Sequence, residues 1–312
     1  MAIPAILQEG LRLPVIAAPM FLISSPRLVI ETCKQGLIGT LPALNARPAA
    51  KFDDWLYEIE AALSGQGAAK YGAMLVMHST NKRLEQDLDT VVRHKVPLVI
   101  TAVGLRADVI KEIHAYGGVV FHDAIHMKHA MKAAEAGVDG IIPICAGGGG
   151  HSGALNPFTF VSQLRACYDG AIILGGALGN GREVRAAEVL GADFAYMGTR
   201  FIPTPEAHAV AEYKQAVVDS KAADIIRTTC FTGLPANFMR SSILSQGLDP
   251  DNLPTKEKDF THEAAGKPVK AWKDVWSAGQ GVGSIDAVEP VADIIARLKA
   301  EYADAKQRIA AL

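Results

Sequence analysis

Short apolar runs alternate with amphipathic stretches over the first two-thirds of the chain. Eight of these runs have the length and composition of strands buried on both faces. The predicted strands are Val15–Ala18, Leu37–Thr40, Gly72–Val76, Leu98–Thr101, Val119–His122, Gly140–Pro143, Ile172–Leu174 and Phe194–Met197. Helical periodicity predicts helices between them at about 26–35, 52–63, 81–94, 107–116, 126–136, 157–168 and 181–190.

The signals at the first predicted helix support this alternation. Ser25 is a suitable N-cap, Pro26 occupies the first helical position and Gly36 follows the last turn. Eight short strands, each followed by a helix, favour a parallel sheet closed into a (β/α)₈ barrel over an open sheet. The expected fold class is therefore α/β, a TIM barrel.

The pattern changes after the eighth predicted strand. No helix follows directly, and a polar stretch over residues 205–275 contains two helical patterns before a final amphipathic helix at about 286–310. We expect residues 1–204 and 276–312 to form the barrel. Residues 205–275 would form a small, mostly helical lid or substrate domain, inserted where barrel enzymes carry their active site.

Composition narrows the class of protein. Hydrophobic residues make up 49% and charged residues 21% of the 312 residues, and the formal net charge is −2. This composition excludes a disordered chain, and without a basic cluster we expect no nucleic-acid partner. No run of about 18 apolar residues predicts a membrane span. Four scattered cysteines and an N-terminal stretch without a basic leader favour a cytoplasmic protein with reduced thiols.

The 29 glycines are concentrated, since fourteen of them lie between Gly137 and Gly198. A run of four precedes His151, and further glycines follow the last two predicted strands at Gly175–Gly176 and at Gly198. In a barrel, glycines at these two strand ends let backbone N–H groups approach a phosphate. The alternative is that they only form tight turns.

Four segments together resemble the nitronate monooxygenases, formerly called 2-nitropropane dioxygenases. They are Ala18–Pro19–Met20, GGHSG at 149–153, LGGALGNGREVRAAEVLGADFAYMGTRF at 174–201 and WSAGQGVG at 276–283. The resemblance implies an FMN-binding barrel that oxidises alkyl nitronates with O₂ to carbonyl compounds and nitrite. Nitroalkanes are a further candidate substrate. Flavin-dependent enoyl-acyl-carrier-protein reductases and quinone reductases share the fold and much of the pattern. The sequence leaves open whether the protein forms a homodimer.

The resemblance also implies roles for individual residues. Ala18, Pro19 and Met20 would line the flavin ring, Gly149 and Gly150 would contact it near the histidine loop, and Gly175, Gly176, Gly198 and Thr199 would hold the FMN phosphate. His151 matches the active-site histidine of the family, and Gln280 lies in a segment expected to return to the barrel mouth.

Three positions depart from the family pattern. Met74 stands where members often carry Asn, Ile144 where many carry Gln or Asp, and Asp123 where one branch places a Lys beside the flavin. Met74 and Asp123 are retained as cofactor-contact candidates. Such changes alter the hydrogen bonds that tune a flavin, so FMN binding is a firmer expectation than the substrate.

Histidines and a cysteine offer other chemistry. His151 would position a nitronate or take the α-proton of a nitroalkane, the alternative being a polar loop residue. His122, Asp123 and His126 lie close in sequence, but without a third ligand motif they predict no metal site. Cys145 before the glycine run is expected to be a buried structural thiol rather than a nucleophile.

Three functions remain open from the sequence. The first is nitronate oxidation. The second is an FMN-dependent reductase that takes hydride from NADH or NADPH and reduces a quinone or an enoyl thioester. The third is a barrel that binds a phosphorylated small molecule without turnover, because fold alone does not imply function.

Overall fold

Eight parallel strands close into a barrel. The computed structural model describes residues 2–257 and 269–311. The barrel strands are β1 (Val15–Ala17), β2 (Ile38–Pro42), β3 (Tyr71–Val76), β4 (Leu98–Ala102), β5 (Val119–Ala124), β6 (Gly140–Pro143), β8 (Ala171–Gly175) and β9 (Phe194–Met197). They pair in this order, and β9 pairs with β1 to complete the ring. The predicted (β/α)₈ barrel is confirmed.

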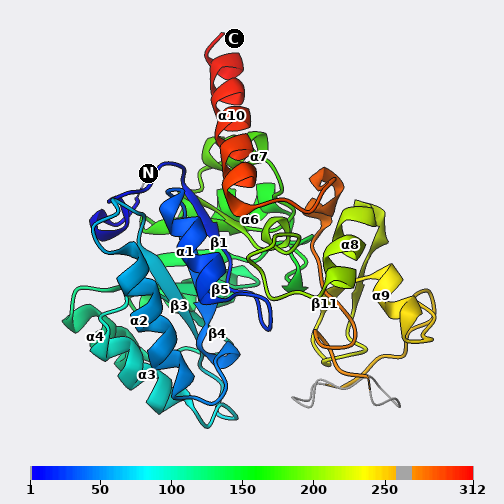
Figure 1. Ribbon diagram of the computed structural model, residues 1–312, viewed down its shortest axis with the longest axis horizontal. Helices are drawn as coiled ribbons and strands as arrows, with labels where there is room; N and C mark the ends of the chain where they lie inside the picture. The colour runs from blue at the N-terminus through cyan, green and yellow to red at the C-terminus, as the bar shows by residue number, and fades with distance from the viewer. Residues whose placement is uncertain (1, 258–268, 312) are drawn as a thin grey trace.

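Helices cover the outside of this barrel (Figure 1). The helices between the strands are α1 (Pro26–Lys34), α2 (Lys51–Leu63), α3 (Leu84–Arg93), α4 (Ala107–Ala115), α5 (Met127–Glu135), α6 (Pro157–Arg165) and α7 (Gly181–Leu190). The C-terminal helix α10 (Val291–Ala310) packs against both α7 and α1. It therefore takes the place of the eighth barrel helix, and its last turns project beyond the barrel in Figure 1.

The helix ends follow the local sequence signals. The backbone N–H of Leu28 donates to Ser25 Oγ over 3.3 Å, which confirms Ser25 as the N-cap of α1. At the start of α7, Asn180 and Glu183 form a capping box. Such caps satisfy backbone donors that the helix itself leaves unpaired, and they fix where each helix leaves the barrel.

Alternate residues of the strands fill the barrel interior. Buried side chains from all around the ring meet there, and the rings of Phe121 and Phe194 lie 6.3 Å apart. The buried cluster contains Leu7, Ile16, Ile38, Leu98, Ile100, Val119, Phe121, Ile142, Ala171, Ile173, Phe194 and Tyr196. Ala18, Met74 and Ile144 pack on this cluster but are only partly buried. The barrel is thus a packed core rather than a pore.

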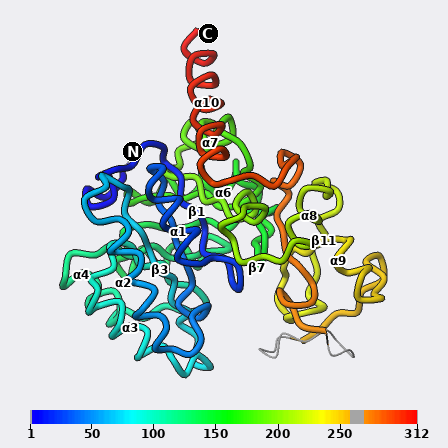
Figure 2. Tube along the Cα trace, viewed as in Figure 1, coloured from blue at the N-terminus to red at the C-terminus, as the bar shows by residue number. Residues whose placement is uncertain are grey.

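The segment between β9 and α10 contains strands as well as helices. It holds α8 (Ala211–Asp219), β10 (Ile225–Thr228), β11 (Ala236–Met239) and α9 (Arg240–Ser245). β11 pairs antiparallel with β10 and with β7 (Gly150–His151), which comes from the loop after β6 (Figure 2). This mixed composition departs from the mostly helical lid that the pattern predicts, because β10 and β11 lack clear alternation. The division into barrel and lid domains stays a prediction.

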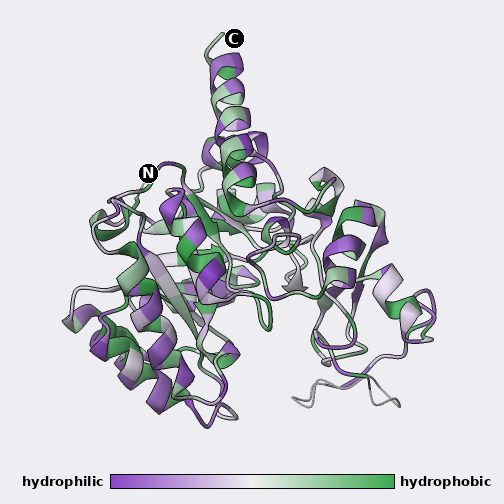
Figure 3. Ribbon diagram, in the orientation of Figure 1, coloured by the Kyte–Doolittle hydropathy of each residue, from purple (hydrophilic) through white to green (hydrophobic). Residues whose placement is uncertain are grey.

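The described helices are amphipathic rather than uniformly apolar. In Figure 3 hydrophobic and hydrophilic residues share the same helical ribbons, and the buried apolar residues of α2 and α3 belong to one cluster with residues of the barrel strands. Among residues 2–257 and 269–311, no helix combines the length and the apolar character needed to cross a membrane.

Helix α10 offers a test of its role in the barrel. Ile294 is 0% exposed between the barrel and its neighbours, whereas Ile309 near the end of the same helix is 45% exposed. Ile294→Ala should lower the free energy of unfolding by about 2–5 kcal/mol, because it removes buried methyl groups and leaves a cavity. Ile309→Ala, the matched control, should change it by less than about 0.5 kcal/mol. Chemical denaturation measures both, and equal effects would contradict the assignment of α10 as the eighth barrel helix.

Candidate active site

The glycine loop, residues 145–153 after β6, is tied down at both ends. The backbone N–H of Cys145 donates to the carbonyl of Gly175 over 2.7 Å, and that of Gly153 donates to the carbonyl of Ile144 over 3.1 Å. The loop therefore closes on itself beside the end of β8. Between these anchors the chain presents the glycine run and His151 at the carboxyl end of the barrel.

The glycine loop packs backbone against backbone on the return segment, residues 276–284. A Cβ on Gly279 would lie 2.6 Å from the carbonyl oxygen of Gly147, and one on Gly149 would lie 3.1 Å from the nitrogen of Gly279. The N–H of Gln280 donates to the Gly147 carbonyl over 2.8 Å. The N–H of Gly279 donates to Thr199 Oγ1 over 2.9 Å, which adds the end of β9 to the same junction. These glycines are required by close approach within the chain.

Two buried polar side chains join the glycine loop to β11. Asn237 Nδ2 donates to the carbonyl of Gly148 over 2.6 Å and to Ser152 Oγ over 3.2 Å. Ser277 Oγ accepts from the N–H of Gly150 over 2.6 Å and donates to the carbonyl of Asn237. Both side chains are at least 94% buried, so these bonds are shielded from water and hold the loop firmly.

His151 is held from three sides. Its backbone pairs with Ala236 on β11, its ring meets the edge of Trp272 with centroids 5.1 Å apart, and Nε2 lies 3.2 Å from Thr232 Oγ1. The Thr232 hydroxyl donates its proton to the carbonyl of Leu234 over 2.8 Å. We therefore assign a proton of the ring to Nε2, which donates to the Thr232 hydroxyl.

The loop after β1 is positioned by Asn45. Asn45 Nδ2 donates to the carbonyls of Met20 and Ser24, each over 2.9 Å, and Asn45 Oδ1 accepts from the N–H of Leu22. Asn45 is thus occupied in holding this loop and not in lining a pocket. The predicted residues Ala18, Pro19 and Met20 are half-buried, and Met20 lies against Gly198 at the end of β9.

The ends of β8 and β9 carry unpaired backbone donors. Within the described chain, the N–H groups of Gly176, Gly198 and Thr199 donate no hydrogen bond. Gly176 has φ +132° and would meet the Ala146 carbonyl at 3.2 Å if it carried a Cβ. Gly175 ends β8, next to Tyr196 of β9. Neighbouring unpaired donors of this kind suit an anionic group such as a phosphate.

One carboxyl group lies in the otherwise apolar upper layer of the barrel. Asp123 of β5 is half-buried, but its Oδ1 has no solvent contact and no hydrogen-bond partner among the residues described. Burial raises the pKa of Asp123 to about 7. Burial, together with the nearby Asp123 carboxyl, raises the pKa of Tyr196 well above its usual value.

The remaining histidine and cysteine candidates have structural partners. His122 Nδ1 lies 2.7 Å from Thr101 Oγ1. His126 caps α5, and its ring lies 3.6 Å from that of His129, tilted by 37°. In the part of the chain that the structure describes, no group of three or more His, Cys, Asp or Glu side chains is arranged to hold a metal. Cys145 is fully buried, and burial raises the pKa of its thiol to about 12, which disfavours the reactive thiolate.

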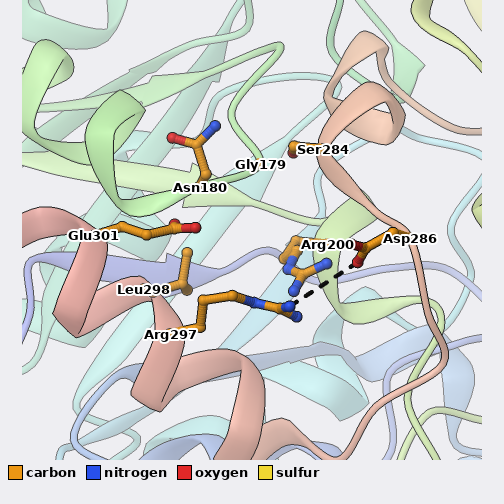
Figure 4. Close-up of a pocket in the computed structure, with 8 residues that line it drawn as sticks. All are labelled: Gly179, Asn180, Arg200, Ser284, Asp286, Arg297, Leu298 and Glu301. Carbon is orange, nitrogen blue, oxygen red and sulfur yellow. Dashed lines mark ion pairs between the residues drawn. The ribbon is translucent and has the colours of Figure 1, made fainter.

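A polar pocket of about 140 Å³ lies between the start of α7, the return segment and α10 (Figure 4). Its walls include Arg200, Arg297, Asp286 and Glu301. Arg200 is 2% exposed and pairs with Glu289 over 3.2 Å. None of the predicted site residues lines this pocket, and Arg297 in its wall pairs with Asp286 over 3.9 Å, so we do not assign the reaction to it.

Several residues at the mouth were not predicted. Asn237, Ser277 and Thr232 organise the glycine loop and His151, and Tyr196 shares the upper barrel layer with Asp123. Polar residues within the apolar stretch LPANFM were the available signal for Asn237. No local pattern connects residues 277 and 237 with residue 150, because the contact depends on the tertiary fold.

Comparison with known proteins identifies the family. A model of the family described as nitronate monooxygenase matches residues 48–301. The chain belongs to the nitronate monooxygenase family. Its members are flavin-dependent oxidoreductases that act on a small-molecule substrate with O₂, so the protein is an enzyme of this kind. The resemblance recognised in the sequence is confirmed.

Individual relatives agree with this family in sequence and in fold. A nitronate monooxygenase from Paraburkholderia phytofirmans is 26% identical over 94% of this chain and 93% of its own length. The nitroalkane oxidase from Streptomyces ansochromogenes superposes with a TM-score of 0.85 at 21% identity, covering 97% of this chain and all of that one. FabK from Thermotoga maritima has a TM-score of 0.80 at 20% identity, covering 98% and 97%. At these identities the two structures show the shared fold alone.

The chain's own residues fit a bound flavin phosphate. The unpaired N–H groups of Gly176, Gly198 and Thr199 lie at adjacent strand ends, next to the glycine loop and the loop after β1. All thirteen residues singled out in the sequence lie on barrel strands, on the loops at their carboxyl ends or on the return segment. Their individual contacts with a flavin stay predictions.

The junction of the two glycine segments can be tested by substitution. Gly279→Ala would place a methyl group 2.6 Å from the Gly147 carbonyl oxygen, so the return segment must move. We expect a loss of about 1–3 kcal/mol in the free energy of unfolding and a lower flavin content after purification. In the control Gly283→Ala, the nearest atoms lie 3.9 Å away, and both properties should be preserved. Thermal unfolding and the visible absorption spectrum report the two effects; a stable, fully flavinated Gly279→Ala would refute the role of this contact.

Proposed function

We propose that this family member is an FMN-dependent nitronate monooxygenase that converts alkyl nitronates and O₂ to carbonyl compounds and nitrite. The observation that carries the proposal is the placement of His151. Its ring is fixed by contacts with Thr232 and Trp272. His151 itself belongs to the glycine loop, in which Gly149 packs against Thr199. His151 therefore lies beside the ends of β8 and β9, whose unpaired backbone N–H groups suit a phosphate.

FMN is the flavin that this arrangement favours. The N–H groups of Gly176, Gly198 and Thr199 would hold its phosphate, and Ala18, Pro19 and Met20 would lie along its ring. When bound, the flavin supplies the electron transfer to oxygen that no protein side chain performs. The protein contributes position, exclusion of water and a controlled proton.

His151 is proposed to act on the substrate directly. Thr232 holds the ring through Nε2, and the imidazole would take the α-proton of a nitroalkane as a general base. The protonated ring would instead hold the negative nitro group of a nitronate by charge and hydrogen bond. In both roles Trp272 restricts the ring's orientation.

The proposed reaction is tested by adding an alkyl nitronate to the flavin-loaded protein without oxygen. Bleaching of the flavin band, followed by its recovery and by release of nitrite on admission of O₂, is the expected result. The matched control is the parent neutral nitroalkane at the same concentration, which should react more slowly because a proton must first be removed. No bleaching by several chain lengths of nitronate would exclude this function.

Replacement of His151 tests its role. His151→Ala should retain FMN but lose about 10²-fold or more in kcat/KM, the range typical of a lost acid–base group. His114→Ala is the control, because His114 pairs with Asp139 outside the barrel mouth over 2.8 Å. Steady-state nitrite release and the flavin content of each variant are measured together. Unchanged turnover in His151→Ala would refute the assignment.

An FMN-dependent reductase is the second candidate. Met74, Ile144 and Asp123 replace polar or cationic residues that family members often carry, so the electronic surroundings of the flavin differ here. Rapid anaerobic bleaching by NADH or NADPH, followed by reoxidation with a quinone or an enoyl thioester, would favour the reductase over the nitronate reaction. The non-catalytic alternative is not retained, because the family consists of flavin-dependent oxidoreductases.

A further inference from the structure

Asp123 occupies an unusual place in the barrel. It follows Phe121 by two residues on β5, and because strand side chains alternate, both point into the barrel interior. Phe121 belongs to the packed core, so Asp123 forms the next layer towards the carboxyl ends of the strands. This is the layer that faces the proposed flavin and substrate.

The surroundings of Asp123 offer its inner oxygen nothing to bind. The adjacent strand β6 pairs Asp123 with Ile142, and β4 ends at Ala102, so both neighbours are apolar. Asp123 Oδ1 has no solvent contact and no hydrogen-bond partner within the described chain. The next residue back, His122, instead lies against Thr101.

The phenol of Tyr196 on β9 is a titratable group near enough for the Asp123 carboxyl to raise its pKa. Among the described residues, no cation contributes to the electrostatic surroundings of Asp123. Ionisation would leave the shielded Oδ1 without a hydrogen-bond donor or a counter-charge from the described residues, which is unfavourable. A neutral carboxylic acid avoids that cost and carries one O–H donor.

We propose that Asp123 is a carboxylic acid in the resting protein and that it donates a hydrogen bond to an electron-rich acceptor atom at the barrel mouth. The acceptor is either a ring oxygen or nitrogen of the bound flavin or an oxygen of an anionic substrate. The chemistry is the same for both, a neutral acid that favours negative charge on its partner. Only the substrate form of this inference rests on the proposed nitronate reaction.

The inference has a defined pH dependence. Burial raises the pKa of Asp123 to about 7, so the donor is present below this pH and is lost as the pH rises through it. If an anion binds only the protein with protonated Asp123, its apparent dissociation constant is inversely proportional to the protonated fraction. Between pH 6 and pH 8 that fraction falls about tenfold, and the apparent dissociation constant should rise about tenfold.

Infrared spectroscopy tests the protonation state without any turnover. The wild-type protein should show a carboxylic-acid C=O band at pH 6 that weakens about tenfold by pH 8, and Asp123→Asn should lack it. Asp108→Asn is the control, because Arg106 lowers the pKa of the exposed Asp108 to about 2 and this variant should keep the band. A band that is absent from the wild type at pH 6, or unchanged in Asp123→Asn, would overturn the proposal. If Asp123→Asn does not fold, Asp87→Asn decides, because burial also raises the pKa of Asp87 and the titrating band must persist in this variant if Asp123 carries it.

Two further measurements identify the acceptor. For the flavin, the midpoint potential of the substrate-free protein is measured against pH, and a break near pH 7 that Asp123→Asn removes would place the acceptor on the flavin. For the substrate, nitrite is the anionic probe, and the tenfold rise in its dissociation constant should vanish in Asp123→Asn. If neither quantity changes its pH dependence in Asp123→Asn, the donor role is refuted. Failure of nitronate to bleach the flavin would refute the proposed function while leaving the infrared and potential results intact.

Discussion

The mouth of this barrel depends on one contact of backbone with backbone, between the glycine loop after β6 and the return segment before α10. Gly279 lies so close to Gly147 and Gly149 that no side chain fits between them. Thr199 at the end of β9 accepts a hydrogen bond from the same segment. Three parts of the chain that are remote in sequence therefore meet at one point, and the orientation of His151 depends on that junction.

This contact separates the glycines into two groups with different causes. Gly147, Gly149 and Gly279 are explained by packing within the chain, with their neighbours at van der Waals distance or closer. Gly176 is packed as closely, but Gly176 and Gly198 differ in that their N–H groups have no partner among the residues described. A concentration of glycine along the sequence thus indicates where a site lies, but only the hydrogen bonds distinguish the residues that build it from those available to a ligand.

The same distinction explains what the sequence could predict. The barrel strands, the helices and the Ser25 cap were predictable because periodicity and capping are local properties. The final helix was predicted too, although it begins at Val291 rather than near residue 286. The two-residue strand β7 and its partner β11 were not, since their pairing joins residues 85 positions apart, as in the contact of Ala236 with His151. Asn237 and Ser277 were missed for the same reason.

The polar groups of the mouth are arranged in two levels. The rim carries His151 and backbone donors, whereas the layer beneath, with Met74 and Ile144, is apolar except for Asp123 and Tyr196. A cation in that lower layer would stabilise negative charge on a flavin directly, and this chain has none at Asp123. An ionised carboxylate would disfavour that charge, so the neutral acid suits a reduced flavin better than the carboxylate does. Burial supplies that neutral acid, because removing water from Asp123 favours its protonated form.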